Sequence, residues 1–170
     1  MNTPITDKAG NQATPFHYGS GHFMPARAAD PDLFYDANYT DYLLFLCSTG
    51  FNLDSTFLCP KHPPSPSNLN YPSLAIADLN GTVTVTRTVT NVGPSKSVYN
   101  LTTKPPTGFS VKISPTVLHF SRVQEKRNFF ITVEAKSGIG QPKRGEYAFG
   151  WYVWSDGIHM VRSPIAVLSA

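Results

Sequence analysis

A strict alternation of side chains in TVTVTRTVTNV, residues 82–92, restricts the fold of this chain more than any other feature of its sequence. Threonine occupies the even positions from 84 to 90. Valine occupies the odd positions from 83 to 89, except that Arg87 stands among the valines. Successive side chains of a β-strand point to opposite faces, so the pattern predicts a strand with one polar and one apolar face.

Further strands are expected at roughly ten-residue spacing after this one. The 15 prolines and 12 glycines of the chain point away from long helices and toward short strands joined by turns. Asp156 and Gly157 supply the tightest hairpin signal, and Pro164 places part of the last strand at an edge or a bulge. The expected strands are 97–103, 109–114, 117–120, 128–135, 146–154 and 158–168. The pattern predicts a mainly β fold, a sandwich or a barrel of about seven short strands.

The sequence before the first of these strands has a different character. Residues 1–15 are polar and rich in turn formers, and residues 16–36 predict irregular loop with a short helical turn near 26–29. A proline-rich stretch at 61–72 predicts a stiff, extended linker. We therefore expect three parts: a mostly irregular segment 1–60, the linker 61–72 and a β-domain 73–170.

One longer helix is expected at 40–49, TDYLLFLCST. Thr40 or Asp41 can cap its start, and Gly50 stands where a left-handed C-terminal cap is favoured. The apolar residues 42–47 surround the helix instead of forming a stripe, so it needs cover on more than one side. The first 60 residues offer little such cover.

Arg87 interrupts the valine face and admits two interpretations. A bulge can turn the side chain outward, or its long stem can carry the charge to water. Alternatively the guanidinium is buried and held by an acidic partner, in which case breaking the pair is strongly destabilising.

Charge and hydropathy exclude several function classes. The formal net charge is +3, and the 14 basic residues are scattered with no more than two adjacent, which is not typical of a nucleic-acid binder. No apolar segment is long enough to span a membrane. We find no phosphate-binding glycine loop or pair of carboxylates, and expect no small-molecule ligand or cofactor. Residues 1–15 hold no apolar core of a signal peptide, so we expect an N-terminal part to be missing.

Three N-x-[ST] sequons, at Asn38, Asn80 and Asn100, favour a secreted protein and are candidate glycosylation sites. A disulfide between Cys47 and Cys59 would fit that compartment. The alternative is two reduced, buried thiols in a cytosolic protein.

The stretch TPFHYGSGH, residues 14–22, places His17 and His22 on either side of a Gly-Ser-Gly. A nucleophilic serine needs a strand before it, a helix after it, and a base held by an acid. No apolar strand precedes Ser20, and its two neighbouring glycines make a flexible bend. The histidines are five apart, which is not the spacing of a helical metal site. We expect neither a catalytic residue nor a metal ligand in this chain.

Several stretches together resemble the C-terminal part of plant subtilisin-like serine proteases: ATPFHYGSGHFMPARAADPDLFYD, DYLLFLC, NLNYPSLA, VTRTVTNVG and WSDGIHMVRSPIAV. The resemblance implies a fibronectin type III-like β-sandwich after the linker. It also implies that the segment before the linker, mostly irregular with one short helix, is the end of the subtilisin α/β domain.

The same resemblance implies that the catalytic machinery lies outside this chain. The family's G-T-S-M-x-C-P and H-G-T-H motifs are absent, so no catalytic residue can be carried over to Ser20 or to any histidine. Where the family usually reads D-P-G-L-V-Y-D, this chain has Asp32 in place of the glycine, at a position expected to take a positive φ.

From this resemblance we expect a non-catalytic C-terminal part of a secreted, extracellular serine endopeptidase. Its partner would be the missing catalytic domain, whose folding and activity it would support. The alternative is a free-standing binding or decoy module that docks on intact subtilases or on cell-wall partners.

Overall fold

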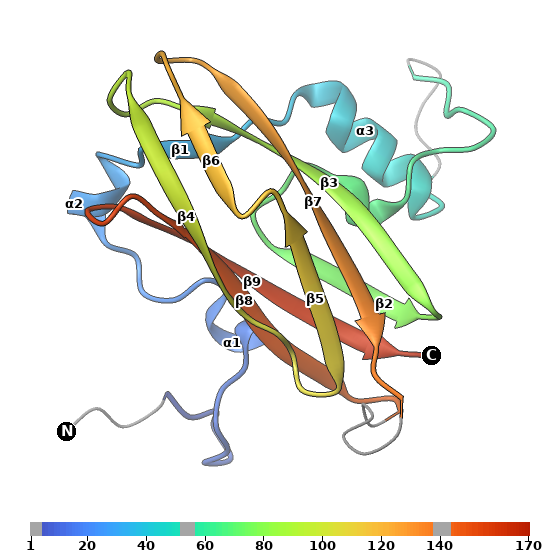
Figure 1. The fold of residues 1–170 in the computed structure, drawn as a ribbon. Helices are drawn as coiled ribbons and strands as arrows, with labels where there is room; N and C mark the ends of the chain where they lie inside the picture. Colours follow the sequence, from blue (N-terminus) through green and yellow to red (C-terminus); the bar gives the residue numbers. More distant parts are fainter. Residues whose placement is uncertain (1–4, 52–56, 138–143) are drawn as a thin grey trace.

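The computed structural model describes residues 5–51, 57–137 and 144–170, and its described strands form two facing sheets (Figure 1). The short helices are α1 (Pro15–Tyr18), α2 (Pro25–Ala28), α3 (Tyr39–Ser48) and the 3-10 turn η1 (Pro66–Asn68). The strands are β1 (Leu33–Tyr35), β2 (Leu74–Leu79), β3 (Thr82–Asn91), β4 (Ser97–Lys104), β5 (Phe109–Ser114), β6 (Val117–Phe120), β7 (Lys126–Ala135), β8 (Tyr147–Ser155) and β9 (Met160–Ser169).

One sheet has the strand order β1-β3-β7-β5 and the other the order β2-β9-β8-β4-β6. Neighbouring strands run antiparallel, except that β2 pairs parallel with β9. The expected mainly β sandwich is confirmed, and the seven strands expected from periodicity correspond to β3 to β9.

Strand β3 has the two faces that its alternation predicts. Val85 and Val89 are buried, and Arg87 lies on the same inward face. On the outward face the hydroxyl of Thr84 is 2.9 Å from that of Thr132 on β7. The register of β3 and β7 is unbroken from Thr82 to Thr90, so no bulge turns Arg87 outward.

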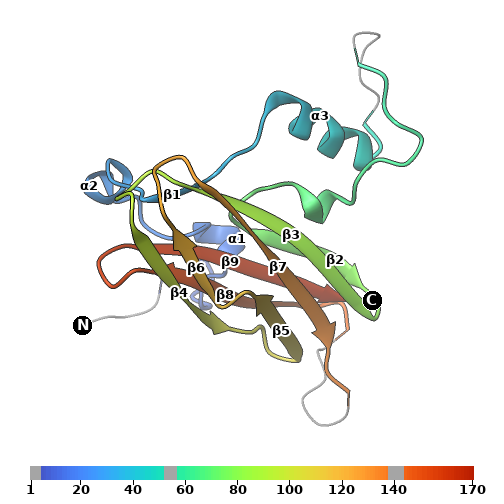
Figure 2. The same ribbon diagram turned by 45° about the horizontal axis from the view of Figure 1, so that its top comes forward.

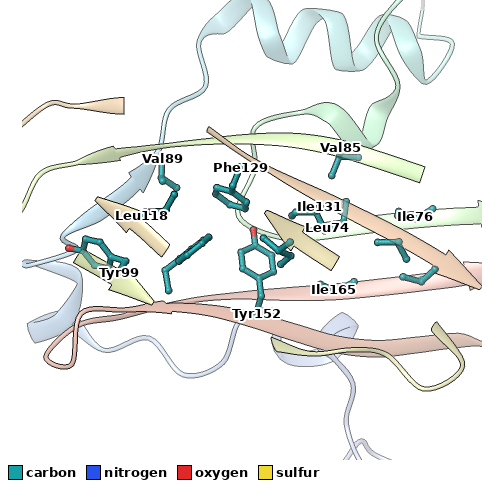
Figure 3. Packing of buried hydrophobic residues seen from close by; sticks show 14 of the residues in the cluster. Leu74, Ile76, Val85, Val89, Tyr99, Leu118, Phe129, Ile131, Tyr152 and Ile165 are labelled. Carbon is teal, nitrogen blue, oxygen red and sulfur yellow. The ribbon is translucent and has the colours of Figure 1, made fainter. Parts of the chain in front are cut away.

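The hydrophobic core fills the space between the two sheets (Figure 3). The side chain of Phe129 on β7 extends across the core and contacts the opposite sheet. Its ring meets those of Tyr152 and Trp154 on β8 edge-on, with centroids 5.9 and 5.2 Å away. Edge-to-face packing of this kind is favoured over flat stacking because of the ring quadrupoles.

Two strands were not expected. We predicted irregular loop over residues 16–36, and this is wrong for the short helix α1 and for β1, which pairs antiparallel with β3. Leu33 is buried in the core and Tyr35 packs against it, so this three-residue strand is held by tertiary contacts. Strand β2, next to the proline-rich stretch, completes the other sheet. The predicted helical turn near 26–29 is present as α2.

Helix α3 confirms the helix expected at 40–49, with a different cap. Asn38 precedes it, and its Oδ1 accepts from the backbone N–H of Asp41 at 3.1 Å, so neither Thr40 nor Asp41 is the N-cap. Gly50 takes the predicted left-handed conformation, with φ of 80°. Figure 2 shows α3 standing apart from both sheets, on the side of β2 and β3.

Residues 61–72 are attached to the sandwich near their end. The Asn70 side chain donates to the carbonyl oxygens of Asp36 and Thr88, both at 2.9 Å, and accepts from the Thr88 N–H at 2.8 Å. The division of the chain into domains stays a prediction, but β1, which precedes this stretch, lies in the same sheet as β3.

Candidate functional site

Ser20 lies in the exposed loop after α1, and its surroundings lack the geometry that a catalytic nucleophile requires. Its backbone carbonyl oxygen accepts from the Arg162 guanidinium at 3.2 Å. The Nδ1 of His17 faces the Thr14 hydroxyl at 3.0 Å, and His22 is exposed. Within the described parts of the chain, no imidazole is hydrogen-bonded to the Ser20 hydroxyl.

The most concentrated set of ionisable groups lies elsewhere, between the loop after α2 and the β8–β9 turn. We name it the carboxylate–histidine cluster: Asp30, Asp32, Asp156 and His159. The His159 Nδ1 is 2.9 Å from the Asp32 Oδ2 and 3.1 Å from the Asp156 Oδ2. Its Nε2 is 3.2 Å from the Asp30 Oδ2. Both ring nitrogens therefore face carboxylates.

Asp32 is the buried member of the cluster, with 1% of its surface exposed. Its φ of 61° confirms the positive φ expected where the resembling family has glycine. Its carbonyl oxygen accepts from the N–H groups of Val92 and Gly93, which fixes the loop against the end of β3. The Tyr99 hydroxyl donates to the Asp32 Oδ2, whereas the buried Oδ1 has no hydrogen-bond partner among the described residues.

These contacts shift the ionisation of the groups around the ring. The hydrogen bond to Asp156, with that to Asp30, raises the pKa of His159 above its ordinary value of 6.5. Burial opposes ionisation of Asp156, but hydrogen bonds from the His159 backbone, the His159 ring and the Ile158 N–H lower its pKa to about 2. Burial and the bond to Asp32 raise the pKa of Tyr99. The contacts of the ring thus favour its imidazolium form.

Asp30, Asp32 and His159 can each offer one donor atom within 4.8 Å of the others. Such proximity is compatible with a metal ion, but here the two ring nitrogens engage carboxylates on different sides. The two N–H donors of one imidazolium can serve carboxylates on both sides of the ring, and the buried Asp32 Oδ1 stays without a donor. The sequence places Asp156 only in a turn and gives no signal for His159.

Arg87 is a second buried polar residue, and the structure confirms its burial but not the acidic partner that the second interpretation expected. The residue is 2% exposed, so it neither turns outward nor reaches water. Its Nε donates to the Tyr71 carbonyl and its Nη1 to the Thr86 carbonyl, both at 3.0 Å. No carboxylate of the described residues forms an ion pair with it, and desolvation lowers its pKa.

Near Arg87, three hydroxyl groups join β1 to the opposite sheet. The Tyr35 hydroxyl is 3.0 Å from that of Tyr152 and 3.1 Å from that of Ser163. Desolvation raises the pKa of both tyrosines, so they remain neutral hydrogen-bonding groups. Arg87 thus donates to two carbonyl oxygens, and its bond to the Tyr71 carbonyl holds that segment against β3.

Cys47 and Cys59 form a disulfide, which joins the end of α3 to the start of the proline-rich stretch. Asn38, Asn80 and Asn100 are all exposed, although the Asn38 side chain also caps α3. Glycosylation of these three residues stays a prediction. None of the helices in the described residues is both long enough and apolar enough to traverse a bilayer.

Comparison with known proteins gives concordant results for the sandwich. Residues 68–167 match the family model described as "Fibronectin type-III domain". The chain is 50% identical over 169 residues to "Subtilisin-like protease SBT5.6" of Arabidopsis thaliana, an alignment that covers 96% of this chain and 21% of that protein. It is 51% identical over 172 residues to "Subtilisin-like protease SBT5.5" of the same plant, covering 98% and 21%. The chain thus spans about a fifth of the length of these curated relatives.

The fold was also compared with solved structures. The FixG-related protein from Vibrio parahaemolyticus matches with a TM-score of 0.41 and 14% identity, over 52% of this chain and 78% of its own.

Proposed function

Since the chain belongs to the fibronectin type-III domain family and matches the C-terminal part of plant subtilisin-like proteases, we propose that it is a non-catalytic part of such a protease. In this role the sandwich supports the folding and activity of the protease's catalytic domain. The proposal rests on one observation: nearly the whole chain is similar to proteases about five times its length.

The geometry around Ser20 supports the absence of catalysis in the isolated chain. A serine nucleophile requires a hydrogen-bonded base and a donor pair for the developing oxyanion. Ser20 is exposed between two glycines of positive φ, Gly19 and Gly21, and its carbonyl is bound by Arg162. An unassisted hydroxyl in a flexible loop is a poor nucleophile.

Exposed apolar side chains support a docking role. Tyr39, Tyr42 and Phe51 lie on or next to α3, and Leu58 precedes the disulfide cysteine; all four are exposed. Large exposed apolar surface usually marks a contact with another protein or domain. We name these four exposed side chains on and next to α3 the α3 face. We infer that the α3 face contacts the catalytic domain, which would supply the cover that the apolar helix requires.

The test is a reconstitution in trans. A homologous subtilisin-like protease is truncated so that it lacks the region matching this chain, and its peptidase activity and melting temperature are measured with and without the purified chain. We expect the chain to raise both. Tyr42→Ser, on the α3 face, should weaken the effect, whereas Thr84→Ser, on the exposed face of β3, serves as the matched control.

Two results would redirect the proposal. Inhibitor-sensitive proteolysis by the isolated chain, lost in Ser20→Ala, would overturn its non-catalytic character. Binding to an intact protease without any gain in the truncated enzyme's activity would instead favour the free-standing binding module.

We also propose that the parent protein is secreted. The disulfide and the three exposed sequons support an oxidising, glycosylating route. Expression in a eukaryotic secretory host followed by mass spectrometry of Asn38, Asn80 and Asn100 tests this; absence of glycan at all three would contradict the glycoprotein part of the proposal.

A further inference from the structure

The carboxylate–histidine cluster joins two segments that are distant in the sequence, the loop after α2 and the β8–β9 turn. We propose that His159 is a pH-dependent latch: its imidazolium form holds the Asp30–Asp32 loop on the β8–β9 turn, and loss of its proton releases Asp30 and α2. This inference concerns the fold of the chain itself and does not depend on the proposed function.

The His159 ring needs two N–H donors to satisfy the carboxylates on both of its sides. Carboxylates face both nitrogens of the ring, with Asp32 and Asp156 on the Nδ1 side and Asp30 on the Nε2 side. An ionised carboxylate only accepts hydrogen bonds, and a neutral imidazole donates from one nitrogen alone. Both sides can be satisfied at once only when the ring is protonated.

Loss of the ring proton breaks the contact between His159 and Asp30. Nδ1 lies between two carboxylate oxygens, so it retains the remaining proton when the ring becomes neutral. The Nε2 lone pair then faces the Asp30 Oδ2 at 3.2 Å, and the two acceptors repel each other. The Asp30 side chain is 73% exposed, so it can turn to water at little cost. Asp32 stays attached through the bonds of its carbonyl oxygen to Val92 and Gly93.

Loss of the ring proton also affects the buried Asp32. Within the described residues, His159 is the only cationic partner of Asp32, whose Oδ1 has no donor. A buried carboxyl group that loses a hydrogen-bond donor is strongly unfavourable. Deprotonation of the ring therefore weakens the whole junction, in addition to the contact with Asp30.

Other ionisable groups around the ring do not replace it. His22, Arg27 of α2 and Arg162 of β9 line the same hollow as His159. Among the described contacts, Arg162 is engaged by the Ser20 carbonyl, and neither His22 nor Arg27 is paired with a cluster carboxylate. Tyr99 of β4 reaches the cluster only through Asp32, as a neutral donor.

The direction of the response follows from linkage. Because the pKa of His159 is raised in the folded chain, its contribution to stability is fully present below pH 6.5, its ordinary value. That contribution is lost as the pH rises through the raised value. The Asp156 pKa of about 2 keeps its carboxylate ionised throughout this range.

The test measures hydrogen-exchange protection of residues 24–32 in the full chain between pH 6 and pH 8.5, corrected for intrinsic exchange rates and with a chelator present. We expect protection to fall severalfold toward high pH. In His159→Gln protection should be low at both pH values, and in Asp30→Asn the fall should shrink, because an amide can donate to the neutral Nε2. His22→Gln, in the same hollow, should behave as the unchanged chain.

Protection that is constant with pH would overturn the latch, as would a pH response that persists in His159→Gln. A response that disappears on removing the chelator and adding zinc would indicate metal binding in its place. Asp30→Asn changes an exposed side chain without altering its shape, so it keeps the test decisive even where His159→Gln fails to fold.

Discussion

Phe129 offers the most direct test of the sandwich, because its neighbour Phe130 provides a matched control. Phe129 is fully buried between the sheets, while Phe130 points outward from the same strand and is 51% exposed. Both residues pair with β3 in the same ladder, opposite Arg87 and Thr86. Replacing either by alanine removes the same atoms, so the difference between them isolates the burial of the ring.

The magnitude follows from the burial and the ring contacts. Phe→Ala at a fully packed position costs about 3–5 kcal/mol, from lost transfer energy and the cavity left behind. The edge-to-face contacts of Phe129 with Tyr152 and Trp154 place it toward the upper part of this range. Phe130→Ala should cost less than about 1 kcal/mol, since much of its ring is already in water.

The assay is urea and thermal unfolding with the disulfide intact. For a chain of this length, Phe129→Ala should lower the melting temperature by about 6–20 °C and Phe130→Ala by no more than about 4 °C. Phe129→Leu, expected to cost about 1–2 kcal/mol, remains measurable where the alanine variant unfolds. Equal losses for the two alanine variants would refute the inward orientation of Phe129 and with it the register of β3 and β7.

Three further perturbations have defined outcomes. Arg87→Met should cost no more than about 2 kcal/mol, below the 3–5 kcal/mol for breaking a buried ion pair, and a larger loss in urea unfolding would indicate an acidic partner. Gly93→Ala would place a Cβ 1.7 Å from the Asp32 Oδ1, so it should lose about 1–3 kcal/mol, and a double-mutant cycle with Asp32→Gly should remove that loss. Reducing the Cys47–Cys59 disulfide, whose cysteines are 12 positions apart, should remove about 2–3 kcal/mol of local stability and lower helical circular dichroism while the sandwich still melts cooperatively.

Strands β3 to β9 could be predicted because each carries its own signal. Alternating side chains define β3, and turn residues such as Asp156 and Gly157 separate β8 from β9. Strand β1 carries none: three residues are too few to show a period, and only pairing with β3 makes them a strand. Strand β2 was not predicted because it lies next to the proline-rich stretch. Its parallel pairing with β9 completes the second sheet.

The carboxylate–histidine cluster could not be predicted, because its members come together only through the fold. Asp30 and His159 are 129 positions apart. One signal was present: an aspartate where the resembling family has glycine places a carboxylate in a close-packed turn, and a buried carboxylate requires a donor or a cation. For Arg87 the sequence correctly placed the side chain on the valine face, but the Tyr71 carbonyl that accepts from its Nε lies in a loop with no periodicity.

Asn70 and β1 together determine how the chain can be divided. The Asn70 side chain is hydrogen-bonded to the carbonyl of Asp36, which follows β1, and to the backbone of Thr88 in β3. The segment between Asp36 and Asn70, which carries α3, therefore leaves and rejoins the sheet at the same place. A fragment that begins after this segment would lack β1 and expose the β3 edge at Val89–Asn91, where free amide and carbonyl groups can recruit strands from other molecules. Recombinant sandwiches should therefore begin ahead of Leu33.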